Sequence, residues 1–277
     1  MEPLLKWAGG KRHIADTLKN FFPVDWNENT YYEPFIGGGA MLFNLKPNKA
    51  VIADFNSRLV TFYCHTRDNH LELFEEIVKV AADFNIKDGL EEKKHYFLQL
   101  RREFNTVDKT SLRSSVLLYT LNKLCFNGLY RENSKGEFNV PFGQKKVFPG
   151  LKLQDFEEAR RILVNTDIVN QDFEKTMIMA VEGDFIYLDP PYIPVNLTSS
   201  FTAYHAEGFS SADQKRLADR MVALQKKGIK AMCSNSDTPL ARDIYAELRF
   251  EVIEAPRMVS ASAGGRGKIK ELVIMNY

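Results

Sequence analysis

The chain is poor in the features that mark secreted, membrane or zinc-binding proteins. Its 277 residues include three cysteines, Cys64, Cys125 and Cys233, which form no Cys-x-x-Cys pair. This spacing argues against a disulfide framework or a zinc site and fits a reducing compartment. No apolar run approaches the length of a membrane span, and the first residues lack the basic and apolar stretches of a secretory signal. We therefore expect a cytoplasmic protein with no membrane partner, no metal and no obligate protein partner.

A large excess of charge of one sign is missing as well. The 37 basic and 36 acidic residues leave a formal net charge of +1, which by itself does not indicate a nucleic-acid partner. Such a balance does not exclude one, because a DNA-binding protein can concentrate its positive charge on one face. A hydrophobic content of 44% and a charged content of 26% are typical of a soluble globular protein.

Short apolar segments that alternate with helical patterns indicate the fold class. The segments that we interpret as strands are residues 31–35, 50–53, 185–188, 229–233 and 271–275. The clearest helix is 211–227, where Ser211 and Gln214 are predicted to form a capping box and Gly228 to end the helix. Strands that alternate with helices predict an α/β protein with a mostly parallel sheet and helices on both faces.

The alternation of strands and helices disappears in the middle of the chain. Helical patterns dominate there, at 71–84, 91–104 and 112–126, and are followed by a stretch rich in Asn, Gly, Lys and aromatics at 127–143. We interpret residues 57–170 as a mainly helical domain inserted into an α/β domain made of residues 1–56 and 171–277. Within the insert, the turn signal Asn133-Ser134-Lys135-Gly136 predicts a β-hairpin.

Three consecutive glycines, residues 37–39, join a predicted strand to a predicted helix at 41–45. This is the arrangement of a nucleotide-binding first turn. It does not match the dinucleotide pattern GxGxxG, because Leu42 stands where the third glycine would be, so a ligand without phosphates is favoured. Asp54 ends the second strand, where an acid typically accepts hydrogen bonds from ribose hydroxyls.

Two further segments could serve the same ligand. Near the N-terminus, Trp7 offers a stacking face and Lys11 a cation for a carboxylate, and the two glycines between them let the backbone approach a ligand closely. A basic, flexible loop would explain this segment equally well. Farther along the chain, Asp172 could sit against the adenine of the same ligand.

The most informative element is the tetrad Asp189-Pro190-Pro191-Tyr192, which follows the apolar strand at 185–188. The prolines have no N–H and a fixed φ, so the strand must stop in a rigid turn with free carbonyls. Open α/β sheets bind ligands at this end of their strands. A planar ring could stack on Tyr192 while its exocyclic amino group donates to the Asp189 carboxylate and the Pro190 carbonyl. The tetrad therefore indicates an amino group of a nucleobase as the target, although such a sequence can also be only a turn.

Taken together, these segments resemble the Dam-type DNA adenine-N6 methyltransferases, in which a target-recognition domain interrupts the catalytic domain. The likeness rests on Lys-Trp-Ala-Gly-Gly-Lys at 6–11, Phe-Ile-Gly-Gly-Gly at 35–39, Asp54 and the tetrad, and it covers nearly the whole chain. It implies a Rossmann-like methyltransferase fold, S-adenosylmethionine as cofactor and double-stranded DNA as partner. The cofactor-binding residues that we expect are Trp7, Lys11, Phe35, Gly37, Gly39, Asp54, Asp172 and Asp189, and the catalytic residues are Asp189, Pro190 and Tyr192.

The hairpin segment resembles the recognition hairpin of family members that methylate GATC, so the likeness implies that site. Arg131 could bind guanine O6 and N7, and Pro141 could contact a thymine methyl. Phe126 would wedge into the gap left by a flipped base, and Phe201 would cover that base. The DNA-binding residues that we expect are Lys6, Phe126, Asn127, Leu129, Arg131, Asn133, Pro141, Lys145 and Phe201. An exposed hairpin with ordinary charges would explain the segment as well.

Several other functions remain open at this point. A zinc deaminase also flips its base, and residues 205–207 match its His-x-Glu fragment, but the Pro-Cys-x-x-Cys partner is missing. A nicotinamide-dependent dehydrogenase shares the fold class but not the glycine pattern. A DNA-binding regulator would have no use for Asp189 and Tyr192. Cytosine-N4 methylation is the closest chemical rival, and Asp189 favours adenine because many such enzymes have Ser there. Restriction-modification and the marking of DNA for replication or repair are both compatible roles.

Overall fold

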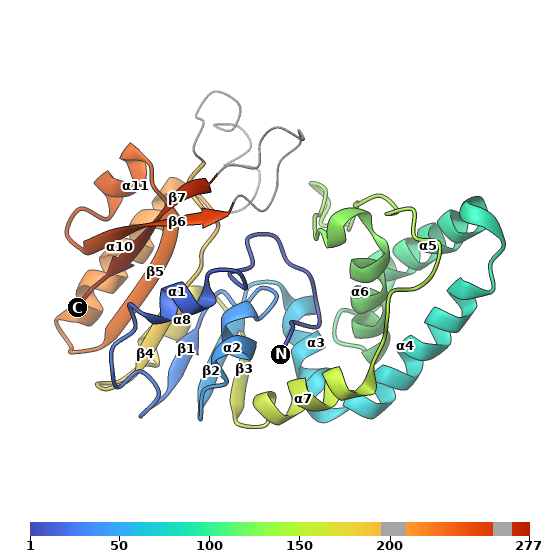
Figure 1. Ribbon diagram of the computed structural model, residues 1–277, viewed down its shortest axis with the longest axis horizontal. Helices are drawn as coiled ribbons and strands as arrows, with labels where there is room; N and C mark the ends of the chain where they lie inside the picture. Colours follow the sequence, from blue (N-terminus) through green and yellow to red (C-terminus); the bar gives the residue numbers. More distant parts are fainter. Residues whose placement is uncertain (195–208, 257–267) are drawn as a thin grey trace. The chain divides into compact units, whose positions relative to one another are not determined.

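The computed structural model describes residues 1–194, 209–256 and 268–277 (Figure 1). The chain forms two compact units, and neither is continuous in sequence. The first, which we call the helical unit, comprises Met1–Gly10, Gly37–Lys46 and Asn56–Asn170, and the second, the sheet unit, comprises Lys11–Ile36, Pro47–Phe55 and Gln171–Tyr277. In the described part of the chain, no helix has both the length and the apolar character needed to cross a membrane.

The strands form one mostly parallel sheet. They are β1 (Tyr31–Glu33), β2 (Ala50–Asp54), β3 (Thr166–Asn170), β4 (Phe185–Leu188), β5 (Lys230–Ser236), β6 (Arg249–Pro256) and β7 (Lys268–Met275). Their order in the seven-stranded sheet is β3-β2-β1-β4-β5-β7-β6. Strands β2, β1, β4 and β5 pair in parallel, whereas β7 runs antiparallel to both β5 and β6. The predicted α/β class with a mostly parallel, Rossmann-like sheet is therefore confirmed.

Both faces of the central strands are covered. The helices of the sheet unit are α1 (Ala15–Lys19), α8 (Phe173–Ile178), α10 (Ser211–Gln225) and α11 (Pro239–Ile244). On one face, Phe22, which follows α1, packs its ring 4.5 Å from that of Phe185 in β4. From β1, Tyr32 donates a hydrogen bond to the carbonyl of Met179, directly after α8. Strand β4, Phe-Ile-Tyr-Leu, is buried at every position, which explains why it was predictable from sequence as an apolar run.

The strands that sequence reasoning missed are the two edges of the sheet. Neither β3 nor β6 was predicted, and both carry polar residues along much of their length. Edge strands are commonly polar or charged, because an apolar edge would pair with other chains. An apolar run is therefore a poor signal for an edge strand. The first strand was predicted too long, since β1 ends at Glu33 rather than Phe35.

The capping box of α10 was predicted one residue too late. Ser210, not Ser211, is the N-cap, and its side chain accepts a hydrogen bond from the Asp213 amide while the Asp213 carboxylate accepts one from the Ser210 amide. Gln214, which we expected in this box, is fully buried and donates to the Pro191 carbonyl at 2.7 Å. Its side chain thus supports the tetrad rather than the start of the helix.

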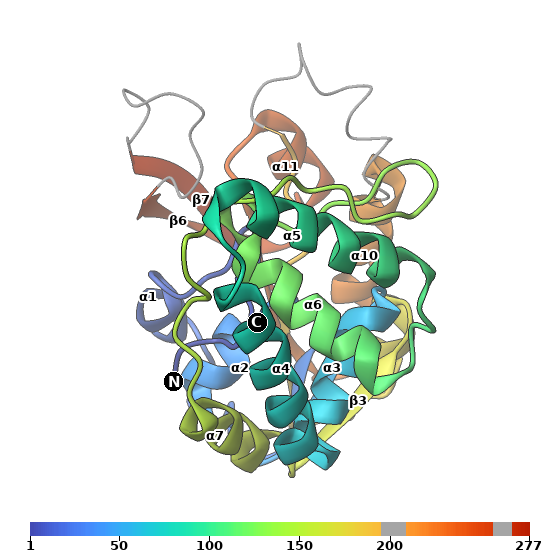
Figure 2. The same ribbon diagram turned by 90° about the vertical axis from the view of Figure 1, so that its right-hand side faces the viewer.

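The helical unit is built around one central helix. Its helices are α2 (Ala40–Leu45), α3 (Ser57–Asp68), α4 (His70–Asn85), α5 (Gly89–Thr106), α6 (Leu112–Leu124), the 3₁₀ turn η1 (Phe126–Gly128) and α7 (Leu153–Leu163). Helix α6 packs against α3, α4 and α5 and is buried along nearly its whole length (Figure 2). The predicted helices of this segment are confirmed, with the correction that α6 ends at Leu124 rather than at residue 126.

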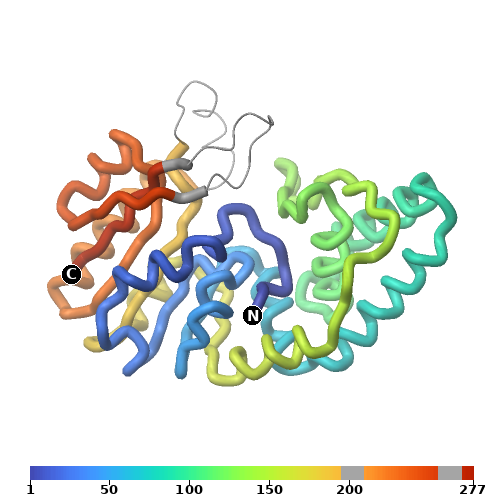
Figure 3. Tube along the Cα trace, viewed as in Figure 1, coloured from blue at the N-terminus to red at the C-terminus, as the bar shows by residue number. Residues whose placement is uncertain are grey.

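After α6 the chain folds out and back as a hairpin, residues 125–143 (Figure 3). Two antiparallel bridges, Cys125 with Phe142 and Glu132 with Phe138, hold its legs together. The side-chain oxygen of Asn133 closes the turn by accepting hydrogen bonds from two backbone amides farther along it. The predicted hairpin is confirmed, but isolated bridges form it in place of regular strands.

Candidate functional site

The tetrad begins directly after β4 and carries an ion pair between a half-buried carboxylate and a buried lysine. The Asp189 carboxylate lies 2.8 Å from Nζ of Lys11, whose side chain is only 5% exposed. The same Nζ lies 4.5 Å from the centroid of the Tyr192 ring. Burial raises the pKa of Asp189, and the positive charge of Lys11 acts in the opposite direction. The sheet unit therefore brings together Lys11, Asp189 and Tyr192, which the sequence analysis placed in one site.

Side chains from neighbouring elements hold the tetrad backbone. Gln214 of α10 donates to the Pro191 carbonyl at 2.7 Å, and Asn235 of β5 accepts a hydrogen bond from the Ile193 amide at 3.0 Å. The Gln214 oxygen in turn accepts from Asn235 and from the Tyr245 hydroxyl. Buried polar groups that are fully paired in this way make a rigid support. Sequence reasoning assigned Gln214 to a capping box and missed Asn235 and Tyr245, because no local motif indicates their contacts with the tetrad.

The glycine run at 37–39 is shaped by the packing of Trp7. A Cβ atom on Gly37 would lie 2.8 Å from Cδ1 of Trp7, and one on Gly38 would lie 2.9 Å from the Trp7 Cβ. Gly37 also has a φ of 48°, a conformation that side chains disfavour. The Trp7 ring stacks on that of Tyr130, with centroids 5.1 Å apart. One face of the Trp7 ring is thus covered by a protein ring.

Gly39 is the N-cap of α2 and likewise has no room for a side chain. Its φ is 74°, and a Cβ atom there would lie 2.7 Å from the Phe43 ring. The Tyr63 hydroxyl of α3 donates to the Gly37 carbonyl at 2.7 Å, which fixes the run from the other side. Triple glycine is therefore a steric requirement of this turn, as well as a means for backbone to approach a ligand.

The predicted ribose acceptor stands at the carboxyl end of β2. Asp54 is the last residue of that strand and is half-buried, and Phe55 after it is 85% exposed. Because β2, β1 and β4 are parallel, their carboxyl ends lie on the same side of the sheet, and Asp54 and Asp189 both follow such ends. Phe35, just beyond β1, stacks on Phe173 with ring centroids 5.3 Å apart.

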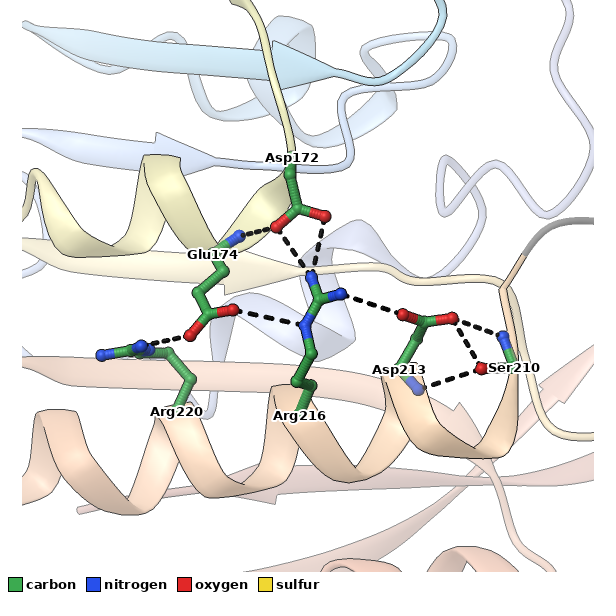
Figure 4. A network of polar contacts seen from close by, with 6 residues as sticks. All are labelled: Asp172, Glu174, Ser210, Asp213, Arg216 and Arg220. Atoms are coloured by element: carbon green, nitrogen blue, oxygen red, sulfur yellow. Dashed lines mark hydrogen bonds and ion pairs between the residues drawn. The ribbon is translucent and has the colours of Figure 1, made fainter.

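Asp172 is part of an ionic network that joins α8 to α10 (Figure 4). Both oxygens of its carboxylate accept from Nη2 of Arg216 at 2.8 Å, and the carboxylate also caps the first turn of α8 by accepting from the Glu174 amide. Arg216 also pairs with Glu174 and Asp213, and Arg220 pairs with Glu174. A direct contact between Asp172 and an adenine stays a prediction, while its role in joining the two helices is visible.

In the helical unit, Lys6 is built into the base of the hairpin. The Asn122 side chain accepts from the Lys6 amide and donates to the carbonyls of Lys6 and Gly128, at 2.8–3.0 Å. A Cβ atom on Gly128 would lie 2.7 Å from the Lys6 side chain. The Lys6 side chain is exposed, so its charge is available to a ligand.

The expected base-reading residues are spread along the hairpin, from its base to its turn. Arg131 is exposed, and its Nε donates to the Asn139 side chain at 2.7 Å. Phe126 is 52% exposed, and its amide donates to the carbonyl of Pro141, which is itself exposed. Of the other expected residues, Asn127 has a left-handed backbone with φ 55° and is exposed, Leu129 and Lys145 are half-buried, and Asn133 closes the turn.

One predicted DNA-binding residue, Phe201, lies outside the described residues, as does the His-x-Glu fragment at 205–207. Within residues 1–194, 209–256 and 268–277, there is no group of three or more His, Cys, Asp or Glu side chains placed to hold a metal ion. The described side chains therefore offer hydrogen bonds, charge and stacking faces.

Comparison with known proteins agrees with this arrangement. The model of the D12 class N6 adenine-specific DNA methyltransferases matches residues 7–260. The chain is 41% identical to the type II methyltransferase M1.LlaDCHI of Lactococcus lactis, a match that covers 100% of this chain and 96% of that protein. It is 36% identical to the type II methyltransferase M.MjaIII of Methanocaldococcus jannaschii, covering 100% and 99%.

A second group of relatives carries a different name. The chain is 34% identical to the DNA adenine methylase of Escherichia coli over 98% of this chain and 94% of that protein. Both groups match along nearly the whole length of this chain and of the relatives themselves. On this evidence the chain belongs to the family of D12 class N6 adenine-specific DNA methyltransferases.

Proposed function

We propose that this enzyme transfers a methyl group from S-adenosylmethionine to N6 of an adenine that has been flipped out of duplex DNA, in the sequence GATC. The observation that carries the proposal is the grouping of Asp189, Lys11 and Tyr192 at the end of β4. It joins an acceptor for an amino group to an aromatic face for the base. The tetrad would perform the chemistry, and the hairpin would read the DNA.

The residues present fit the proposed methyl donor. Asp54 is a half-buried carboxylate at a strand end, suited to ribose hydroxyls, and the glycine run presents backbone without side chains. The other residues that we propose for donor binding are Trp7, Lys11, Phe35, Asp172 and Asp189. The donor would supply an electrophilic methyl group on a sulfonium, so the protein needs to supply position rather than a nucleophile.

The chemical difficulty lies in the adenine amino group. Its lone pair is delocalised into the ring, which makes N6 a poor nucleophile. Hydrogen bonds from N6 to the Asp189 carboxylate and the Pro190 carbonyl would draw the nitrogen towards tetrahedral geometry and localise the lone pair. Tyr192 would stack on the flipped base, whose extraction from the duplex costs roughly a few kcal/mol. The fixed backbone of the tetrad supports this role, because misplacement by about 1 Å can cost a hundredfold in rate.

For sequence reading we propose Arg131 and Lys6 as guanine contacts and Pro141 and Leu129 as apolar contacts to bases. Phe126 would fill the space left by the flipped base, and Asn127, Asn133 and Lys145 would hold the hairpin or the phosphates. The exposure of Arg131, Lys6, Pro141 and Phe126 supports these roles. Phe201 is proposed to cover the flipped base.

The test uses labelled methyl donor and three duplexes of equal composition, with GATC, with a scrambled site and with GATC in which the adenine is replaced. Digestion of the product to nucleosides separates N6-methyladenine from N4-methylcytosine. We expect N6-methyladenine from the GATC duplex alone. Equal incorporation into the scrambled duplex would remove the GATC assignment and leave the reaction intact. Label in N4-methylcytosine would overturn the proposed target base.

A further inference from the structure

Tyr192 has a buried partner that the sequence analysis did not assign to the candidate site. Its hydroxyl donates a hydrogen bond to Oε2 of Glu271 at 2.8 Å. Glu271 lies in β7, is only 7% exposed and is followed by the fully buried Leu272, Val273 and Ile274. A carboxylate is rarely buried unless it is paired, because burial of its charge is costly. Its presence beside three buried apolar residues therefore indicates a specific role.

The topology explains how Glu271 reaches the tetrad. Strand β7 is antiparallel to β5, and Glu271 pairs with Ser236, the last residue of β5. The amino-terminal part of β7 therefore lies beside the carboxyl ends of the parallel strands, where the tetrad also lies. A parallel strand in this place would have put its amino-terminal residues at the opposite edge.

Burial of this carboxylate is unfavourable, and two neighbours offset part of the cost. Burial raises the pKa of Glu271, whereas the charge of Lys11 and the hydrogen bond from Tyr192 lower it. The same Lys11 pairs with Asp189 and lies over the Tyr192 ring. One buried cation thus serves the buried Glu271, the half-buried Asp189 and one aromatic ring.

These contacts fix the position of the Tyr192 ring at two points, its hydroxyl and one of its faces. Glu271 holds the hydroxyl, and Lys11 occupies one face of the ring at 4.5 Å. A base can therefore stack on the opposite face alone. A ring tethered only through its Cβ would turn about χ1 and χ2, and holding it in one orientation costs side-chain entropy when the base binds.

We propose that Glu271 is a positioning residue for methyl transfer, which fixes the Tyr192 ring in the orientation that stacks on the target adenine. The inference rests on the proposed function. It assigns Glu271 no contact with the base or with the methyl donor. Its effect on the rate is therefore expected to pass mainly through the Tyr192 hydroxyl.

The experiment is a double-mutant cycle read by the single-turnover rate of methyl transfer, with saturating GATC duplex and labelled donor. The variants are Glu271→Ala, Tyr192→Phe and the two combined. Glu271→Gln keeps an oxygen acceptor for the hydroxyl and serves as the conservative variant. Glu251→Ala, on the neighbouring strand β6, removes an exposed glutamate paired with Arg249 and serves as the matched control. Thermal unfolding and the dissociation constant of the donor are measured for each variant.

We expect Glu271→Ala and Tyr192→Phe each to slow transfer by roughly tenfold to a hundredfold, the range of a lost hydrogen bond to a charged group. The combined variant should be no slower than Tyr192→Phe, and Glu271→Gln should recover most of the rate. The control should match the wild type. If Glu271→Ala does not fold, Tyr192→Phe and Glu271→Gln still decide, because the inference requires a loss in the first and recovery in the second.

Two outcomes would overturn the inference. One is a normal rate in Glu271→Ala or Tyr192→Phe, and the other is a loss from Glu271→Ala that is as large in the Tyr192→Phe background as in the wild type. In both, a wild type that methylates adenine leaves the proposed function standing. A wild type that transfers no methyl to adenine would overturn the proposed function, and this inference with it.

Discussion

The tetrad of the sheet unit and the hairpin of the helical unit are held in opposite ways. Around the tetrad, side chains from α10, β5 and β7 bind the backbone of Pro191 and Ile193 and the hydroxyl of Tyr192. In the hairpin, the anchors lie at the base and inner leg, and the outer residues such as Arg131 point into solvent. Chemistry needs fixed groups away from water, whereas sequence reading needs side chains that reach out to the bases.

This contrast predicts which step of the reaction a substitution in each region will affect. A change at the tetrad should lower the rate of the methyl-transfer step at saturating substrate. A change in the outer hairpin should weaken binding of the correct duplex and relax specificity, with the rate of the step nearly intact. The four predictions that follow test this division, beginning with the largest effect.

The largest effect is expected from Asp189→Ala. Without the carboxylate, the amino group loses its proposed acceptor, and single-turnover methyl transfer should fall by about a thousandfold or more. Thermal unfolding should show a folded protein, because Gln214 and Asn235 still hold the tetrad backbone. Asp189→Asn is the control that keeps the size of the side chain and removes its charge. Activity near that of the wild type in Asp189→Ala would contradict the proposed mechanism.

Arg131→Ala should act on recognition instead. Loss of a bidentate guanine contact costs about 1–3 kcal/mol, so kcat/KM for GATC should fall by roughly tenfold to a hundredfold. Discrimination against a substituted guanine at one position should fall by the same factor. Lys135→Ala, an exposed basic residue at the hairpin turn, is the matched control and should behave as the wild type on all duplexes. An Arg131→Ala enzyme with full discrimination would remove this residue from the reading set.

The pH dependence of the rate should reveal the environment of Asp189. Burial raises the pKa of this carboxyl above its usual value of 3.8, and the ionised form is the stronger acceptor for a hydrogen bond from N6. The rate should therefore fall on the acid side at a pH above the ordinary carboxyl range, by about tenfold for each unit below the midpoint. The single-turnover rate measured against pH checks this. Lys135→Ala should give the same curve, and a constant rate down to pH 4 would contradict the prediction.

The raised pKa of Asp189 affects stability in the opposite direction to activity: a rise in pH increases the rate but lowers the free energy of unfolding. A carboxyl that holds its proton more tightly when folded than when unfolded makes the free energy of unfolding decrease as the pH rises through its folded pKa. Asp189 should therefore destabilise the protein at neutral pH, where its charge is needed for activity. This cost is expected at the tetrad, where the carboxylate is enclosed, and not at the exposed residues of the hairpin.

The smallest effect is expected from Asn105→Ala, which removes an anchor of the hairpin. The Asn105 side chain donates to the Phe138 carbonyl at 3.2 Å and accepts from its amide at 2.9 Å. Losing both bonds should lower the free energy of unfolding by about 1–3 kcal/mol and raise KM for the duplex a few-fold. Asn105→Asp keeps the acceptor alone and should lie in between. Chemical denaturation and duplex titration measure the two effects, and a lower single-turnover rate would break the division between the regions.

Much of the candidate site was predictable because its signals are local. Two prolines after an apolar strand end that strand wherever it packs, and a glycine run between strand and helix marks a tight turn at the ligand edge. The hairpin turn was readable for the same reason. The strands missed, β3 and β6, are edge strands whose polar residues give no apolar run.

The sequence by itself therefore determined the fold class, the order of the motifs and the identity of the groups available for chemistry, since these follow from neighbouring residues. Only the tertiary structure decided their partners. Trp7 stacks on Tyr130, Gln214 binds the tetrad instead of capping its own helix, and Glu271 reaches Tyr192 from 79 residues away. Such pairings depend on the register and direction of strands β5 and β7, which no local pattern encodes.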